Sequence, residues 1–271
     1  MKTLLKFLLS VIGLIVTFIV ASTALYSHSL KEASSNIQMQ DIVYLLITCF
    51  WISLTVFYVT QKSHATPLHT ALSLSFSLFF IYALMTQIEA LLWENVSVSS
   101  DTAAVLFLIT GHAIPVIVAV LIGIKLFGND SKPSRYSREP KKFTILEVIV
   151  KLLLTAFFYM LIYFAFGYFV SGQMGAFYVL DAPQAYLIEF GRGLLYGIFA
   201  FPVINIFRKK SFPMLLSLVL LLETPAIYRL VPNCLFPNTV RTGDLWQTAG
   251  ILFLFALATW LVFDKIKIYK Q

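Results

Sequence analysis

Long apolar runs separated by short polar segments set the pattern of this chain. Each run approaches or exceeds about 20 residues, the length that a helix needs to cross the hydrocarbon core of a bilayer. A transmembrane β-barrel would instead show short segments of alternating polarity. We therefore predict eight membrane-spanning helices, at residues 4–26, 42–60, 68–92, 102–127, 144–170, 184–207, 212–230 and 245–263.

The first apolar run has two interpretations, a secretory signal peptide or a membrane span. It follows Lys2 and Lys6, as in a signal peptide. Its apolar stretch from Leu4 to Val20 exceeds the 7–15 residues that are usual for a signal peptide. We therefore expect an uncleaved first span.

The basic residues predict how the chain is oriented. Eight spans place both termini on one side, and cytoplasmic segments carry the excess of Lys and Arg. Most of the basic residues lie in the two termini, in the loops near residues 61–67, 128–143 and 208–211, or in the flanking helix turns. The exceptions are Lys31, Arg192, Arg229 and Arg241. The sequence thus predicts an all-α polytopic transmembrane helix bundle, N-in and C-in, with residues 1–271 forming a single integral membrane domain.

Composition agrees with this fold class and limits the partners. The chain is 59% hydrophobic and 12% charged, whereas soluble domains are nearer one-quarter charged. The basic residues that give the net charge of +7 lie mainly in the predicted cytoplasmic segments. The charge therefore indicates orientation and not a nucleic-acid partner. We expect the lipid bilayer as the main partner and a multi-pass location in a plasma membrane, most simply a bacterial cytoplasmic membrane.

The sixth predicted span carries an unusual pair of charges. Glu189 and Arg192 share one helix face at i,i+3, and Tyr196 continues that face. Charged groups inside a membrane normally face protein or a water-filled cavity. Three interpretations remain open: an ion pair that holds helices together, an anion site at Arg192 tuned by Glu189, and an Arg192 side chain that extends to the outer interface. Gly193 and Gly197 have the spacing that lets another helix approach closely, in the same chain or in a second copy.

The seventh predicted span places a carboxyl group beside a helix breaker. Glu223 precedes Pro225 by two residues, and Arg229 follows near the outer end. Proline cannot donate its backbone N–H, so we expect a kink there. Broken helices with a mid-membrane carboxylate bind cations or protons in transporters. The alternative is a neutral, hydrogen-bonded Glu223 at a purely structural kink.

Three further groups complete the candidate residues. His112 lies near Pro115 in the fourth span, as a packed histidine, a proton relay or a metal ligand. Glu89 lies near the outer end of the third span, and Glu147 with Lys151 forms an expected interfacial pair at i,i+4. Depth along the spans predicts an outward-open polar pocket lined by spans three, four, six and seven. Its candidate substrate- or ion-binding residues are Glu89, His112, Glu189, Arg192, Tyr196, Glu223 and Arg229.

The motifs in the chain narrow its function without identifying a substrate. No P-loop, HExxH or GxSxG motif occurs, and no metal-ligand spacing stands out, so we expect no cofactor, no metal site and no enzyme of these classes. The preferred hypothesis is a transporter or permease for a small solute, with an anionic solute and proton coupling as its more specific forms. The alternatives are a membrane-embedded enzyme acting on lipid or peptide at the outer leaflet, and a non-catalytic assembly, sensor or immunity protein.

Overall fold

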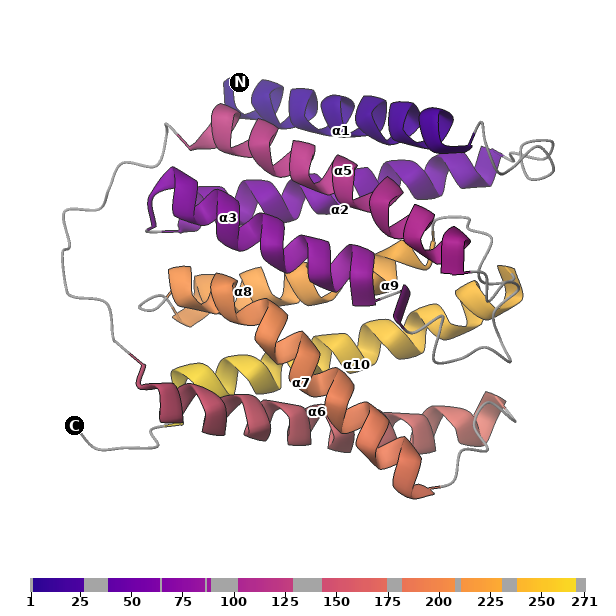
Figure 1. Cartoon of the computed structure of the whole chain (residues 1–271), viewed down its shortest axis with the longest axis vertical. Helices are drawn as coiled ribbons and strands as arrows, with labels where there is room; N and C mark the ends of the chain where they lie inside the picture. Colours follow the sequence, from indigo (N-terminus) through magenta and orange to yellow (C-terminus); the bar gives the residue numbers. More distant parts are fainter. Residues whose placement is uncertain are drawn as a thin grey trace.

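The computed structural model describes residues 2–26, 39–63, 65–85, 87–88, 102–128, 143–174, 182–207, 211–230 and 238–266, and all regular structure in these ranges is helical. Figure 1 shows the helices lying side by side, with the start of α1 and the end of α10 at the same end of the bundle. The helices are α1 (Lys2–Tyr26), α2 (Met39–Lys62), α3 (Pro67–Leu78), the π-helical η2 (Phe79–Leu84), α5 (Thr102–Phe127), α6 (Ile145–Met174), α7 (Ala182–Ile206), α8 (Ser211–Leu222), α9 (Thr224–Tyr228) and α10 (Asn238–Asp264).

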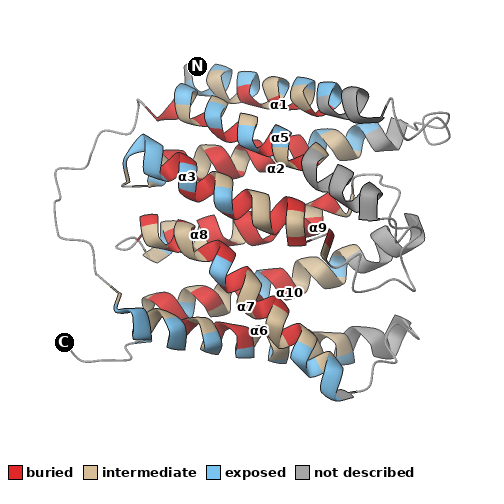
Figure 2. Ribbon diagram, viewed as in Figure 1, coloured by how far each residue is buried: buried red, intermediate tan, exposed pale blue. Residues whose placement is uncertain are grey.

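The prediction of a multi-pass bundle of about eight helices is confirmed. Within the described ranges, seven helices are long and apolar enough to span a membrane, and Gly111–Phe127 of α5 is a shorter apolar helix. Large apolar side chains such as Leu4, Ile12, Leu121 and Leu187 are exposed on the outside of the bundle. Figure 2 shows that exposed positions lie mainly on the outer helices and buried positions toward the centre. An outer surface with exposed apolar side chains is expected where lipid replaces water.

The bundle consists of two halves with the same order of contacts. In the first half α1 packs against α2 and α5, and α3 with η2 packs against α5. In the second half α6 packs against α7 and α10, and α8 with α9 packs against α10. The halves meet where α3 contacts α7 and where α2 contacts α8 and α9 (Figure 1). These two contacts are equivalent, because α3 corresponds to α8 and α2 corresponds to α7. This arrangement indicates an approximate two-fold axis along the helices, although α2 lies much closer to α5 than α7 does to α10.

The third span of each half carries the clearest sign of this relation. Pro67 and Pro213 are separated by the same number of residues as Tyr82 and Tyr228. The two tyrosines lie in matching Ile-Tyr-x-Leu segments, at 81–84 and 227–230. Each of these spans begins with a 12-residue α-helix, α3 or α8, and is then interrupted. The interruption is a π-helix in the first half and the break between α8 and α9 in the second.

The α8–α9 break follows from Pro225, as the sequence predicts. Proline leaves the carbonyl of Leu221 without its helical donor, and the hydroxyl of Thr224 donates to that oxygen at 2.6 Å. The carbonyl of Leu220 accepts from Nε1 of Trp51 at 2.9 Å and from Oγ1 of Thr55 at 3.3 Å, both on α2. Carbonyl groups at the break are therefore bound by side chains of the protein.

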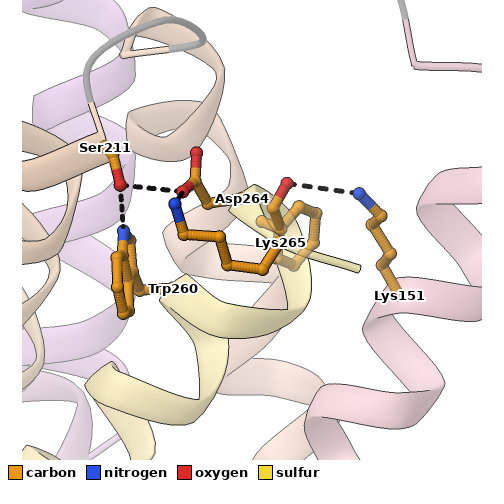
Figure 3. A network of polar contacts seen from close by, with 6 residues as sticks. Lys151, Ser211, Trp260, Asp264 and Lys265 are labelled. Carbon is orange, nitrogen blue, oxygen red and sulfur yellow. Dashed lines mark hydrogen bonds and ion pairs between the residues drawn. The ribbon is translucent and has the colours of Figure 1, made fainter. Parts of the chain in front are cut away.

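The ends of the helices near the termini are fastened inside each half. In the second half, Nζ of Lys151 donates to the carbonyl of Phe263 at 3.2 Å, joining α6 to α10. Ser211 donates to Asp264 at 2.7 Å and accepts from Nε1 of Trp260 at 3.1 Å, joining α8 to α10 (Figure 3). These contacts tie three helices of the second half together at one end.

The first half has a comparable fastening made mostly of aromatic rings. Phe7 of α1 contacts Phe50 and Phe57 of α2, at ring-centroid distances of 5.4 and 5.7 Å. Phe57 contacts Phe127 at the end of α5 at 4.8 Å. Nε2 of Gln61 donates to the carbonyl of Phe127 at 3.4 Å. These contacts tie three helices of the first half together at one end.

The predicted orientation has a direct test by thiol labelling. With Cys49 and Cys234 replaced by alanine, single cysteines are introduced in the segments 31–40, 95–100 and 132–140 in intact cells. An impermeant thiol reagent is expected to react with the first two and not with the third, because the basic loop at 128–143 should be cytoplasmic. Labelling of the 132–140 segment from outside would contradict the N-in, C-in orientation.

Candidate functional site

A cluster of aromatic and polar side chains lies where the two halves meet. His112 of α5 contacts Tyr228 of α9 at a ring-centroid distance of 4.8 Å, Tyr82 of η2 at 5.8 Å and Phe18 of α1 at 6.2 Å. Tyr82 and Tyr228 contact each other edge to face at 5.3 Å. Both tyrosines are fully buried, and His112 is nearly so. The lone histidine of the fourth span thus has aromatic neighbours from both halves.

Gln87 completes this cluster, although its sequence context did not mark it as a candidate. Its Nε2 donates to the hydroxyl of Tyr228 at 3.1 Å, and its side chain is fully buried. Its Oε1 atom has no hydrogen-bond partner among the described residues. A buried amide oxygen without a donor is destabilising, and such an atom often marks a site for water or a ligand. A glutamine in the third span was the available signal, but an uncharged polar residue stands out less than Glu89 beside it. We call Tyr82, Gln87, His112 and Tyr228 the boundary cluster.

Glu223 lies at the break of the seventh span. It is the residue between α8 and α9, and its side chain is buried. Among the described residues, no hydrogen bond or ion pair engages its carboxyl group. Tyr228 follows on α9, roughly 7.5 Å further along the axis at 1.5 Å per residue. The break thus places Glu223 on the same interrupted span as a member of the boundary cluster.

Glu189 and Arg192 form the ion pair that their spacing predicts. Nη1 of Arg192 lies 2.9 Å from both carboxylate oxygens of Glu189, and both side chains are buried. The guanidinium also lies over the rings of Tyr159 and Tyr163 on α6, at 5.8 and 5.5 Å. Tyr196 contacts Tyr159 at 5.6 Å. Because Arg192 is already neutralised and covered by tyrosines, this geometry favours the role of holding α6 and α7 together.

Two of the three glycines of the sixth span, Gly193 and Gly197, allow that close approach. A Cβ atom on Gly193 would lie 2.5 Å from Cβ of Tyr159 and 3.0 Å from the backbone of Ala156. One on Gly197 would lie 3.2 Å from Leu152. The small residues therefore pack within the chain, against α6, as in other membrane helix pairs.

Among the described residues, the contacts of the candidate side chains fall into separate groups. His112 lies in the boundary cluster, on α5 of the first half, while Glu189, Arg192 and Tyr196 lie against α6 in the second. These helices occupy opposite sides of the bundle (Figure 1). Arg229 is the residue that follows α9, and Glu89 lies outside the described residues. Common depth along the spans did not imply contact, because depth does not specify which way each helix face turns.

Lys151 has a larger structural role than an interfacial pair would have. Nζ lies 3.0 Å from Glu147, as the i,i+4 spacing predicts. Yet the side chain of Lys151 is 2% exposed, and its Nζ lies 4.8 Å from the ring centroid of Phe143. Nζ also reaches the last turn of α10 through the Phe263 carbonyl. Only the fold could show this contact, since α10 lies more than 100 residues away in sequence.

The comparison with known proteins adds no assignment. No protein-family model matches the chain, and no curated protein or solved structure is detectably similar to it. Within the described residues, no group of three or more His, Cys, Asp or Glu side chains could hold a metal ion. The function must therefore be argued from the site alone.

Proposed function

We propose that this protein is a transporter or permease for a small solute, with a solute path between its two halves. The supporting observation is that the third span of each half is interrupted, at positions within two residues of each other under the relation that pairs Tyr82 with Tyr228. Paired interruptions at corresponding positions of two repeats mark the binding region of many secondary transporters. The interrupted spans also meet each other, through Tyr82 and Tyr228.

Glu223 is the proposed coupling residue of this transporter. A buried carboxyl at a helix break takes up and releases a proton when its access to water changes. The Leu220 and Leu221 carbonyls are bound by Trp51, Thr55 and Thr224, so the carboxyl is the better candidate for a coupling group than the backbone. We therefore prefer proton coupling through Glu223 to an anion site at Arg192, whose guanidinium pairs with Glu189.

Proteoliposomes with an imposed pH gradient test both statements. The probes are radiolabelled amino acids, mono- and dicarboxylates, sugars and amines, and internal pyranine reports proton movement. Wild-type protein is expected to accumulate one of these classes above empty vesicles, with accompanying proton flux. Glu223→Gln mimics the protonated form, so it should retain solute exchange and lose gradient-driven accumulation by tenfold or more. Glu223→Asp should retain accumulation with a shifted pH profile.

The matched control is Lys265→Gln, at an exposed side chain at the end of α10. It should accumulate solute as the wild type does. Equal accumulation by wild type and Glu223→Gln would show that coupling does not pass through Glu223. Uptake no greater than in empty vesicles for every probe, with no proton flux, would contradict transport itself.

A non-catalytic assembly or immunity protein is the second candidate. It is favoured by the Glu189–Arg192 pair, which is buried under tyrosines and accounts for the charges of the sixth span by packing alone. That function would leave the paired interruptions without a role, so we place it second.

A further inference from the structure

The boundary cluster joins the two halves at their approximate axis. Under a two-fold relation, equivalent residues touch each other only close to the axis, and Tyr82 and Tyr228 are equivalent residues in contact. Both tyrosines and His112 lie roughly 22 Å along their spans from the ends near the termini, at 1.5 Å per residue. The cluster therefore lies in the part of the boundary that is farther from the termini.

The cluster fills this part of the boundary. Tyr82, Tyr228 and Gln87 have no exposed surface, and His112 retains 7%. The rings contact one another edge to face, a favourable arrangement for aromatic pairs. The hydrogen bond from Gln87 to Tyr228 crosses from one half to the other. In this conformation the boundary is closed at the cluster.

Contacts inside each half hold its helices together at the end of the bundle opposite the cluster. Each half is fastened at the other end by its own contacts, Lys151 and Ser211 with α10 in one half and Phe57 and Gln61 with α5 in the other. A relative rotation of the halves would leave these fastenings intact. It would separate Tyr82 from Tyr228. It would also shift Trp51 and Thr55 against the Leu220 carbonyl across the boundary. Rocking of one repeat against the other is the usual motion of transporters built from repeats.

We propose that the boundary cluster is the gate on the side of the membrane opposite the termini, and that it opens to a polar, hydrogen-bonding solute. The proposal rests on the proposed transport function. When the halves part, the hydroxyls of Tyr82 and Tyr228, the ring of His112 and the amide of Gln87 face the opening. The Oε1 atom of Gln87, which accepts no hydrogen bond in the closed state, is then an acceptor for a donor group of the solute.

The first test measures access past the gate without requiring a known solute. Thr224 is fully buried and lies one turn, roughly 6 Å, on the inner side of Tyr228. A Thr224→Cys variant without Cys49 and Cys234 is treated with a charged methanethiosulfonate from the side opposite the termini. Tyr228→Ala or His112→Ala is expected to raise the labelling rate tenfold or more. Tyr228→Phe, which keeps the ring but loses the hydrogen bond from Gln87, should raise it about threefold.

The control for this test is Phe57→Ala, which removes an aromatic contact inside the first half. It should leave the rate of Thr224→Cys labelling unchanged. Gel filtration of each variant shows that it remains folded, and Tyr228→Phe preserves the test if a larger change does not fold. Equal rates in all variants would overturn the gate.

The second test asks whether the gate must open for transport. A short bifunctional methanethiosulfonate is used to join Tyr82→Cys to Tyr228→Cys, and uptake is measured with the transported probe. Cross-linking should remove at least nine-tenths of the uptake, and a reducing agent should restore it, whereas a monofunctional reagent should not mimic the loss. The control pair, Phe57→Cys with Phe127→Cys, has rings 4.8 Å apart within one half and should transport normally when joined.

The outcomes separate the gate from the function on which it rests. Uptake that persists in the cross-linked Tyr82–Tyr228 pair overturns the gate and leaves transport standing. If wild-type protein transports none of the probes, the transport proposal fails, and the labelling of Thr224→Cys still decides whether the cluster closes this side of the boundary.

Discussion

Arg192→Met is expected to destabilise the folded protein by about 3–5 kcal/mol, because it leaves the Glu189 carboxylate buried without its cation. Glu189→Gln should cost a similar amount for the opposite reason, since it leaves a buried guanidinium over Tyr159 and Tyr163. The double variant Glu189→Gln with Arg192→Met carries neither charge and should be more stable than either single variant. Unfolding in a mixed detergent titration with sodium dodecyl sulfate measures these differences.

The exposed pair between Lys265 and Asp264 provides the control. Lys265 is 58% exposed, so Lys265→Met should change the stability by less than about 1 kcal/mol. Single variants at Glu189 and Arg192 that fold as stably as wild type yet lose solute uptake would contradict the structural role. Arg192 would then be the anion site that the sequence left open.

Gly193→Ala is expected to force α6 and α7 apart. The added Cβ would lie 2.5 Å from Cβ of Tyr159 and 3.0 Å from the Cα atom and the carbonyl oxygen of Ala156. Backbone atoms cannot rotate away as the end of a side chain can, so the helices must separate. Overpacking of this kind costs about 1–3 kcal/mol or more. The same detergent titration measures the loss.

Gly191 offers a matched control on the same helix. A Cβ at Gly191 meets nothing within 4 Å. Because alanine is a better helix former than glycine by about 1 kcal/mol in soluble helices, Gly191→Ala should leave the stability unchanged or raise it. Equal losses at Gly191 and Gly193 would show that helix propensity, and not the approach of α6, explains the effect.

Several local features were predictable because they depend on residues close in sequence. The ion pair between Glu189 and Arg192 follows from i,i+3 spacing on one helix. The break after Leu222 follows from the missing N–H of Pro225. The close approach at Gly193 was predictable because glycine has no side chain. The identity of the helix that approaches it, α6, was not predictable.

The π-helix and the role of the third span were not predictable in the same way. Phe79–Leu84 contains neither proline nor glycine, and its composition is that of an ordinary apolar span. Its interruption is recognised as meaningful only beside the α8–α9 break, once both spans lie at the boundary between the halves. The role of Gln87 was not predictable either, because it donates a hydrogen bond to Tyr228 on a different span.

By itself the sequence determined the class of protein, the approximate number of its helices and the break at Pro225. These properties depend on local sequence, on the apolar length that a bilayer requires and on backbone hydrogen bonds within one helix. Only the tertiary structure decided that Arg192 turns to α6 and His112 to the boundary between the halves. In a chain that is apolar nearly all round each helix, the hydrophobic pattern does not distinguish the face toward lipid from the face toward protein. The choice is made by the fit of particular side chains, such as Gly193 against Tyr159, across helices distant in sequence.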